Sequence, residues 1–286
     1  MKLAAIVVTY YPDLNETILF IDKYLNSVDH LIIWQNTPAK DSSNYKIEIT
    51  GYDNRITFMG TGNNEGIGYA LNRAIEWSIE NNFTHLLTMD QDSCFDKNEF
   101  IAFRKFVNDS NKNDIVIFSP VLPGMLIDSK SEIMDVKFSI TSGSILNLFL
   151  TKKIGLFRED FFIDAIDTEY SIRSLSMGYR TVLFTKCLLL QKFGDARKTK
   201  FGFMSTDYSA FRTYHMVRNH IIVWKLFPKH FSFFEASKIY IFQRIIKIIL
   251  AESNKWIKIK SILKGIKDGL ANNILSIDKV NLRINE

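Results

Sequence analysis

Residues 85–92 have the sequence HLLTMDQD. The first five are typical of a short strand buried on both faces of a sheet. Asp90 and Asp92 follow at once, so we expect them at the carboxyl end of that strand. Ligands of open α/β sheets bind beyond this end of the strands. The eight residues therefore predict a sheet and the edge of it where a ligand binds.

Apolar runs of strand length recur on both sides, over residues 3–8, 31–34, 56–59 and 115–118. Stretches with helical spacing of apolar residues alternate with them, over residues 14–25, 67–79 and 99–107. Such alternation predicts an α/β fold, with a mostly parallel sheet and flanking helices. With 286 residues, 47% of them apolar, the chain can bury a full core.

The pattern becomes irregular after residue 119. We expect residues 138–146 to be extended, residues 166–177 to form a helix and residues 181–184 a strand. From about residue 207 the chain is expected to be helical almost to its end. We therefore predict a catalytic domain over residues 1–205 and a helical region over residues 206–286.

Asp90 and Asp92 could bind a metal ion together. Two carboxylates in this spacing can present oxygens to Mg²⁺ or Mn²⁺, and the cation can neutralise a diphosphate. A polar turn that closes a strand would also explain them, since aspartate is common in turns. Their place on the ligand edge of the sheet favours the metal site.

Other polar residues follow the neighbouring strands and should meet Asp90 in one crevice: Thr9, Tyr10, Asn36, Asn63 and Asn64. Residues 64–68, NEGIG, precede a helix, where glycines and free backbone N–H groups suit a phosphate. An ordinary loop before a helix accounts for them equally well. The pattern is neither a Walker loop nor a dinucleotide fingerprint.

An acidic cluster opens the helix expected at residue 166: Asp164, Asp167 and Glu169. Beside aromatic residues, such a carboxylate can become a general base with a raised pKa. Capping of the helix by acids is the alternative. Because Arg173 lies four residues after Glu169, the two can pair along the helix. We predict Asp167 as the base and a structural or acceptor-orienting role for Glu169.

Positive charge is concentrated at the C-terminal end. From residue 225 onward there are 12 Lys and Arg against 5 Asp and Glu, whereas residues 1–224 hold 24 against 26. Residues 231–272 are expected to form amphipathic helices that lie on an anionic membrane surface. A solvated basic face, or one packed on a partner subunit in a homo-oligomer, is the alternative. No nucleic-acid partner is expected, because no binding motif accompanies the charge.

Several other classes of protein find no support. Two cysteines are too few for a disulfide framework and favour a cytoplasmic protein. No uninterrupted apolar run is long enough to span a membrane. The five histidines show no metal-ligand spacing, and no serine-hydrolase pattern surrounds Ser93 or Ser144.

Taken together, the motifs resemble family 2 glycosyltransferases of the GT-A fold, in particular the rhamnosyltransferase-like and galactofuranosyltransferase-like branch. The resemblance runs from residue 3 to about residue 220. It is carried by these pieces in order: Val7-Val8-Thr9-Tyr10, Asn63-Asn64-x-Gly66-x-Gly68-x-Ala70-x-Asn72, Asp90-Gln91-Asp92-Ser93, Thr141-Ser142-Gly143-Ser144, Phe162-Ile163-Asp164-x-x-Asp167-x-Glu169 and Arg212-x-Tyr214-x-x-x-Arg218-Asn219.

The resemblance implies an inverting, metal-dependent sugar transfer from a dTDP-rhamnose or UDP-hexose (galactofuranose included) donor. The acceptor would be a glycan or lipid-linked hydroxyl in bacterial surface polysaccharide synthesis (O-antigen or capsule), at the inner face of the membrane. Asp167 would be the base, and Asp90 and Asp92 would hold Mg²⁺ or Mn²⁺. The resemblance implies donor contacts from Thr9, Tyr10, Asn36, Asn64, Gly66, Asn72 and Asp90, and acceptor or sugar contacts from Gly143, Ser144, Asp164, Glu169 and Arg218.

The sequence departs from the family pattern at three positions. Gln35 stands where relatives often have Asp, and His215 where they often have Tyr. Gln191 stands where relatives place a histidine that serves as a third metal ligand. An amide is a weaker ligand than imidazole for transition metals but is tolerable for a hard cation, so Gln191 is expected to be a weak ligand.

Two alternative functions remain open. A nucleotidyltransferase shares a related architecture but needs a basic, glycine-rich loop after its first strand. Residues 9–12, TYYP, are not such a loop. A non-catalytic scaffold that binds nucleotide sugars is the other alternative, and the departure at Gln191 motivates it.

Overall fold

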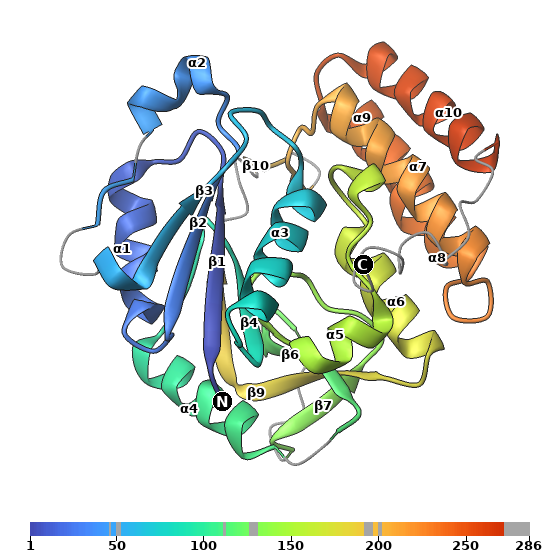
Figure 1. Cartoon of the computed structure of the whole chain (residues 1–286). Helices are drawn as coiled ribbons and strands as arrows, with labels where there is room; N and C mark the ends of the chain where they lie inside the picture. Colours follow the sequence, from blue (N-terminus) through green and yellow to red (C-terminus); the bar gives the residue numbers. More distant parts are fainter. Residues whose placement is uncertain are drawn as a thin grey trace.

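The computed structural model describes residues 1–45, 47–49, 53–110, 113–125, 131–191, 197–199 and 202–271. Its main sheet opens with four parallel strands in the order β3-β2-β1-β4. Their bounds are Ile56–Met59, His30–Gln35, Leu3–Thr9 and His85–Asp90. Val8 pairs with Trp34 on one side and Asp90 on the other. The strands therefore end together at one edge (Figure 1).

The second half of the sheet is mixed. β8 (Ser144–Asn147) is antiparallel to β4 and to β6 (Ile115–Val121). β9 (Arg180–Gln191) runs parallel to β6 and pairs antiparallel with β7 (Ile133–Val136) and β5 (Ser93–Phe95). The far end of β9 places Gln191 opposite Ser93. A residue about a hundred positions away thus lies beside the aspartates that follow β4.

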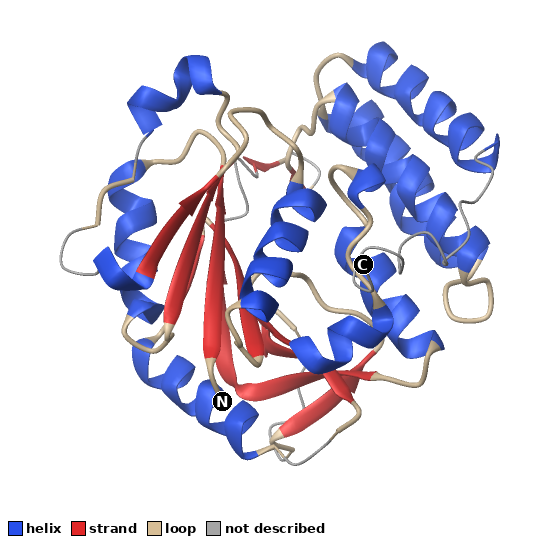
Figure 2. Cartoon of the chain, viewed as in Figure 1, coloured by secondary structure: helices blue, strands red, loops and turns tan. Residues whose placement is uncertain are grey.

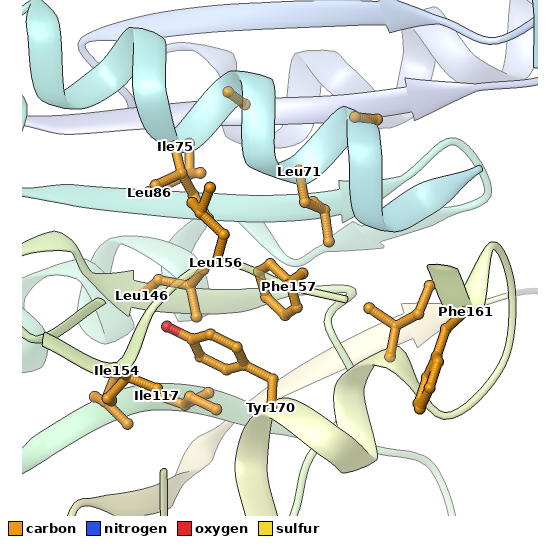
Figure 3. Packing of buried hydrophobic residues seen from close by; sticks show 14 of the residues in the cluster. Leu71, Ile75, Leu86, Ile117, Leu146, Ile154, Leu156, Phe157, Phe161 and Tyr170 are labelled. Atoms are coloured by element: carbon orange, nitrogen blue, oxygen red, sulfur yellow. The ribbon is translucent and has the colours of Figure 1, made fainter. Parts of the chain in front are cut away.

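Helices cover both faces of this sheet (Figure 2). On one side lie α1 (Leu14–Leu25) and α4 (Lys97–Asp109), whose apolar faces share a core cluster with Leu3, Leu87 and Phe118. On the other side lie α3 (Ile67–Glu80), α5 (Leu148–Ile154) and α6 (Ile166–Ser176). Figure 3 shows that second cluster, with Phe157 and Tyr170 stacked at 4.2 Å. Asp13 caps α1 by accepting from the Glu16 N–H, as expected for a helix start. The short helix α2 (Ala39–Ser42) follows β2.

The α/β prediction is confirmed, and one strand prediction is wrong. Residues 138–146 were expected to be extended throughout, but only Ser144–Asn147 forms a strand there. The four residues before it make a tight turn, in which Ser144 N–H donates to Thr141 O. Gly143 takes φ +77° in that turn, a conformation that side-chain-bearing residues rarely adopt. A glycine inside a stretch of alternating residues marks such a turn better than the stretch marks a strand.

The C-terminal part is helical, as expected. It contains α7 (Ala210–Leu226), α8 (Phe233–Ser237), a π-helical turn (Lys238–Gln243), α9 (Arg244–Ala251) and α10 (Lys255–Ala271). α10 packs closely on α7, because Gly265 and Gly269 let their backbones approach. Ile222 and Val223 of α7 belong to the same core cluster as Leu71 of α3. The core therefore crosses the boundary expected at residue 205. No helix in the described residues is long and apolar enough to cross a membrane.

Candidate active site

Asp90, the last residue of β4, and Asp92 are held by contacts from two other segments. The Asp90 N–H donates to Ser142 Oγ at 3.2 Å, and Gln191 Nε2 donates to Asp90 Oδ2 at 3.2 Å. Gln191 also hydrogen-bonds to Asp92. Gln191 therefore lies beside this pair with its Nε2 facing Asp90, and its role as a weak metal ligand stays a prediction. Its amide lies against both carboxylates.

Gln91, between the two aspartates, fastens the ends of β1 and β4 together. Its Oε1 accepts from the Tyr10 N–H at 2.7 Å, and its Nε2 donates to Tyr10 O at 3.1 Å. This paired contact fixes the backbone of Tyr10, whose side chain remains exposed (48%). Sequence reasoning gave Gln91 no role, although its place inside the aspartate motif was the signal for one.

A hollow of about 200 Å³ opens at the ends of β1, β2 and β3. Its lining mixes apolar and aromatic side chains with hydroxyl, amide and glycine residues. Such a mixed lining suits a planar ring with polar edges, such as a nucleobase. Of the residues expected to bind donor, Thr9 lines this hollow; its other lining residues are Ile33, Gln35, Thr37, Ala39, Ser42, Tyr45, Ile47, Phe58, Met59, Gly60 and Gly62.

Asn36 and Asn64 shape the glycine loop before α3. Asn36 is buried; its Oδ1 accepts from the Trp34 indole and the Glu65 N–H, and its Nδ2 donates to Gly66 O. Asn64 Oδ1 accepts from the Gly66 N–H at 3.1 Å. In this structure both amides therefore position the loop.

The loop meets a strained turn that precedes α6. Phe162, Asp164 and Ala165 have φ between 60° and 63°, the left-handed region that side-chain-bearing residues enter at a cost. Asn219 of α7 holds the turn, with its Nδ2 2.9–3.0 Å from the carbonyls of Phe161, Ile163 and Asp164. Backbone strain that the surroundings maintain is typical of functional sites.

The strained turn presents Asp164 and Asp167 to the crevice. Arg212 of α7 reaches Asp164 with Nε and Nη2 at 3.2 Å. Burial raises the pKa of Asp167 to about 6, and the nearby Asp164 adds to that rise. The Thr168 N–H opposes it by donating to Asp167 Oδ1 at 2.7 Å. Asp167 is thus a carboxylate with the basicity that general-base catalysis needs near neutral pH.

The carboxylates of Asp90 and Asp167 lie close enough to interact electrostatically. Burial, together with the negative charges of Asp92 and Asp167, raises the pKa of Asp90 to about 7. Arg212 is the cation that opposes this rise. Clustered buried carboxylates are costly unless a cation compensates them, so the residues fit a hard divalent cation with oxygen ligands. Within the described residues no group of three or more His, Cys, Asp or Glu is arranged for a metal. Asp90, Asp92 and an amide would therefore share such an ion with a ligand's phosphates.

Three residues expected to contact donor or acceptor are buried and bonded within the protein. Asn72 is buried, accepts from the Phe157 N–H and donates to Phe157 O and Glu159. Ser144 is buried, 2.7 Å from Ser119 Oγ and 2.6 Å from Ile140 O. Glu169 forms a buried pair with Arg173 at 2.9–3.0 Å, as its spacing allowed. All three lie on core-facing positions, and a motif match alone does not reveal which way a side chain points.

Two further predicted residues contact the segments that carry the site. Gly143 donates its N–H to Thr88 O at 2.7 Å, and a Cβ there would lie 2.8 Å from Leu189. Arg218 donates to Asp160 O at 3.2 Å and to Asn219 Oδ1 at 2.9 Å. Gly143 therefore lets the turn pack against β9, and Arg218 orients Asn219.

Sequence reasoning missed the contribution of α7 to the crevice. Arg212 and Asn219 touch the strained turn, and the Phe211 ring, 56% exposed, lies 5.7 Å from Phe162. The His215 ring lies 4.5 Å from the Phe211 ring, tilted by 56°. Arg212 and Asn219 stood in the last matching motif, so the signal was present, but nothing in the sequence indicated that α7 folds back onto residues 161–165.

Comparisons with known proteins agree with this geometry. No family model matches the chain. The dTDP-rhamnosyl transferase RfbF of Shigella flexneri is 24% identical over 235 residues, which cover 75% of this chain and 77% of that protein.

Among solved structures, GalNAc-T7 with UDP, GalNAc and Mn²⁺ has a TM-score of 0.60 at 9% identity, over 94% of this chain and 55% of that one. This chain thus spans about half the length of GalNAc-T7. S. aureus TarS 1-349 in complex with UDP has a TM-score of 0.58 at 13% identity, over 100% of this chain and 86% of that one. The matches confirm the GT-A fold and the resemblance to family 2 glycosyltransferases that the motifs indicated.

Proposed function

We propose that the protein is an inverting glycosyltransferase that takes a sugar from a nucleoside diphosphate sugar. One observation carries the proposal: Asp90 and Asp92 at the end of β4 face Asp167 at the head of α6, closely enough for Asp167 to raise the pKa of Asp90. A phosphate-binding edge and a general base on opposite sides of one crevice are what such a transfer requires.

In the proposed reaction the acceptor hydroxyl oxygen attacks the anomeric carbon of the donor. The hydroxyl proton passes to Asp167, the new carbon–oxygen bond forms, and the bond to the diphosphate oxygen breaks with its electron pair. Arg212 lies near enough to Asp90 to lower its pKa, so it also places positive charge beside the departing diphosphate. A divalent cation would neutralise that diphosphate. Asp90 and Asp92 would hold it, together with the Gln191 amide if that amide rotates to present its oxygen.

We infer dTDP-rhamnose as the first donor to test, because the relative that matches in sequence bears that activity in its name. A UDP-sugar is the second, because the UDP complex of TarS has the same fold. The nucleobase would occupy the hollow at the ends of β1–β3. The acceptor hydroxyl belongs on the Asp167 side, beside Asp164 and the exposed Phe211 ring, and a glycan or lipid-linked sugar of a bacterial surface polysaccharide fits this position.

Calorimetry tests the donor. We expect the full chain with Mn²⁺ to bind dTDP-rhamnose more tightly than UDP-sugars, and chelation to weaken binding. If no nucleotide sugar binds, the proposal is wrong; binding without turnover would favour the non-catalytic scaffold. Released nucleoside diphosphate then tests turnover. Asp167→Asn should bind donor like the wild type but release nucleoside diphosphate about 10²–10⁴-fold more slowly when acceptor is present. Asp22→Asn, on the exposed face of α1, should be fully active.

A further inference from the structure

An exposed apolar stripe runs along the outer face of the helix that spans residues 233–251. It consists of Ile239, Phe242, Ile246 and Ile249, which are 48–62% exposed, with Leu250 beside them. Their spacing of three or four residues places them on one side. The opposite side is also apolar, because Ile241 and Ile248 are buried against α7 and α10. A helix that is apolar on both sides is normally covered on both.

The stripe continues around the corner between α9 and α10. Lys255 Nζ donates to Ile249 O at 2.7 Å, which fixes the start of α10 against the end of α9. Trp256 and Ile257, the next two residues, are 70% and 57% exposed. Lys260 lies 5.6 Å from the centre of the Trp256 ring. Large apolar side chains clustered in this way mark a surface that contacts something.

The exposed charges on residues 233–271 are all positive, and the exposed carboxylate beside them, Asp207 at the corner between α9 and α10, is paired with Lys258. Residues 233–271 are all described, and five of their lysines are exposed: Lys238, Lys255, Lys260, Lys264 and Lys267. None of the three carboxylates in that range is exposed. Glu235 pairs with Lys137, Glu252 pairs with Arg244 and Lys258, and Asp268 accepts from the Tyr214 hydroxyl.

We propose that this surface, the apolar stripe with Trp256, Ile257 and the five lysines, docks the protein on an anionic phospholipid membrane. Apolar side chains flanked by lysines and a tryptophan match the interface of such a membrane, where the chains enter the acyl boundary and the ammonium groups meet phosphates. A second copy fits less well, since a two-fold contact would bring identical lysine-rich faces together. Nucleic acid leaves the isoleucines uncovered.

The docking surface connects to the candidate active site through a short chain of contacts. Arg244, at the start of α9, donates to Tyr208 O at 3.2 Å. The Tyr208 ring lies under the Arg212 guanidinium at 4.1 Å, and Arg212 pairs with Asp164. The helix that carries the stripe is therefore linked to Asp164 through only two intervening side chains, Tyr208 and Arg212. When this surface is docked, Asp164 lies on the part of the molecule that is near the membrane. An acceptor sugar carried on a lipid would reach it there, and this last step rests on the proposed function.

Co-sedimentation of the full chain with lipid vesicles tests the docking surface. We expect binding to vesicles of equal parts phosphatidylglycerol and phosphatidylcholine, and at least about tenfold weaker binding to phosphatidylcholine alone. High salt should weaken the binding, because the lysine contribution is screened. Equal binding to both vesicles, or none to the anionic ones, would overturn the proposal. This readout needs no nucleotide sugar, so it is independent of the catalytic assignment.

Matched variants locate the surface. Phe242→Ser with Ile246→Ser should lose at least about tenfold in vesicle binding, whereas Leu19→Ser with Phe149→Ser, which removes equally exposed apolar groups elsewhere, should not. Lys260→Gln with Lys264→Gln should weaken binding similarly, and Lys152→Gln with Lys153→Gln on α5 should leave it unchanged. Retained binding in the stripe variant overturns the proposal. So does light scattering in which that variant converts a wild-type dimer to a monomer, because the stripe then joins two copies.

Discussion

Two carboxylates at the crevice, Asp90 and Asp167, are kept at a cost to the fold. Burial raises the pKa of both, and neighbouring carboxylates contribute: with Asp92 and Asp167 nearby the pKa of Asp90 is about 7, and with Asp164 nearby that of Asp167 is about 6. A core position without function would carry an apolar or amide side chain there, since each ionised carboxylate must be desolvated. The same two features, burial and a neighbouring negative charge, prepare Asp167 to accept a proton and Asp90 to bind a cation.

The pKa of Asp167 sets the acid limb of activity. A general base works only in its ionised form, so transfer should be constant above pH 6 and should fall about tenfold for each pH unit below it. Measurement of kcat/KM against pH with the cognate donor tests this, and we expect an inflection near pH 6. Asp167→Asn should lower turnover by about 10²–10⁴-fold and leave no such limb. A limb retained in that variant would assign the base elsewhere.

Asp90 should make stability depend on pH and on metal. Its folded pKa lies above its unfolded value, so its stabilising contribution is complete below about pH 4 and is lost as the pH rises through about 7. Asp90→Asn should therefore stabilise the protein at pH 8 by about 2 kcal/mol and change little at pH 4.

Thermal and urea melts at both pH values measure this. Mn²⁺ should stabilise the wild type and not Asp90→Asn, because only the wild type binds the cation. Asp109→Asn, an exposed carboxyl at the end of α4, is the control and should change stability by less than about 0.5 kcal/mol. A destabilised Asp90→Asn at pH 8 would contradict the cost assigned to this carboxylate.

At the scale of elements, the site depends on two segments that fix each other: the glycine loop before α3 and the strained turn before α6. The Ile67 N–H donates to Phe162 O at 3.1 Å. A Cβ on Gly66 would lie 2.5 Å from the same oxygen. The close approach requires glycine at position 66, and it holds Asp164 and Asp167 in register with the ends of the parallel strands.

Gly66→Ala tests this contact, and Gly124→Ala is its matched control. Both glycines have φ +82°, but a Cβ on Gly124 meets nothing within 4 Å. Gly124→Ala should cost about 1 kcal/mol from backbone strain alone. Gly66→Ala should cost about 2 kcal/mol more, because the turn must move, and transfer activity should fall with it. Equal losses in urea unfolding would show that the approach to Phe162 is unimportant.

The elements also show which parts of the site are readable from sequence. The buried parallel strands and the polar residues at their ends follow from local pattern, so Asp90, Asp92 and the crevice could be predicted. The proposed ligand role of Gln191 rests only on the family resemblance, and local pattern gave no reason to bring it beside Asp90. The direction of Asn72 and Ser144 depends on which face packs inward, and the role of Arg212 depends on α7 returning to residues 161–165. Neither is encoded in periodicity or spacing.

At the scale of the whole molecule, the α/β body and the C-terminal helices form one core. The cluster that holds Leu71 and Phe157 also contains five residues from beyond position 205: Ile222, Val223, Phe227, Phe231 and Ala236. Burial of four such large side chains contributes about 6–12 kcal/mol, as much as the entire stability of a typical domain. The boundary near residue 205 is therefore a change in secondary structure, from sheet to helices, and the interior is continuous across it.

A chain ending at residue 205 should accordingly fail to fold as a unit. It loses the apolar cover of α3 and α5, and it loses Asn219, which holds the carbonyls of residues 161–164. We expect aggregation, or a species with far-ultraviolet helical signal and no cooperative melt. Co-expression of residues 206–286 should restore soluble protein, because the missing surface is then supplied in trans. A monomeric 1–205 fragment with a sharp thermal transition would contradict a shared core. The C-terminal helices would then be a separate domain that docks on the α/β body, and Arg212 would pair with Asp164 only in the docked state.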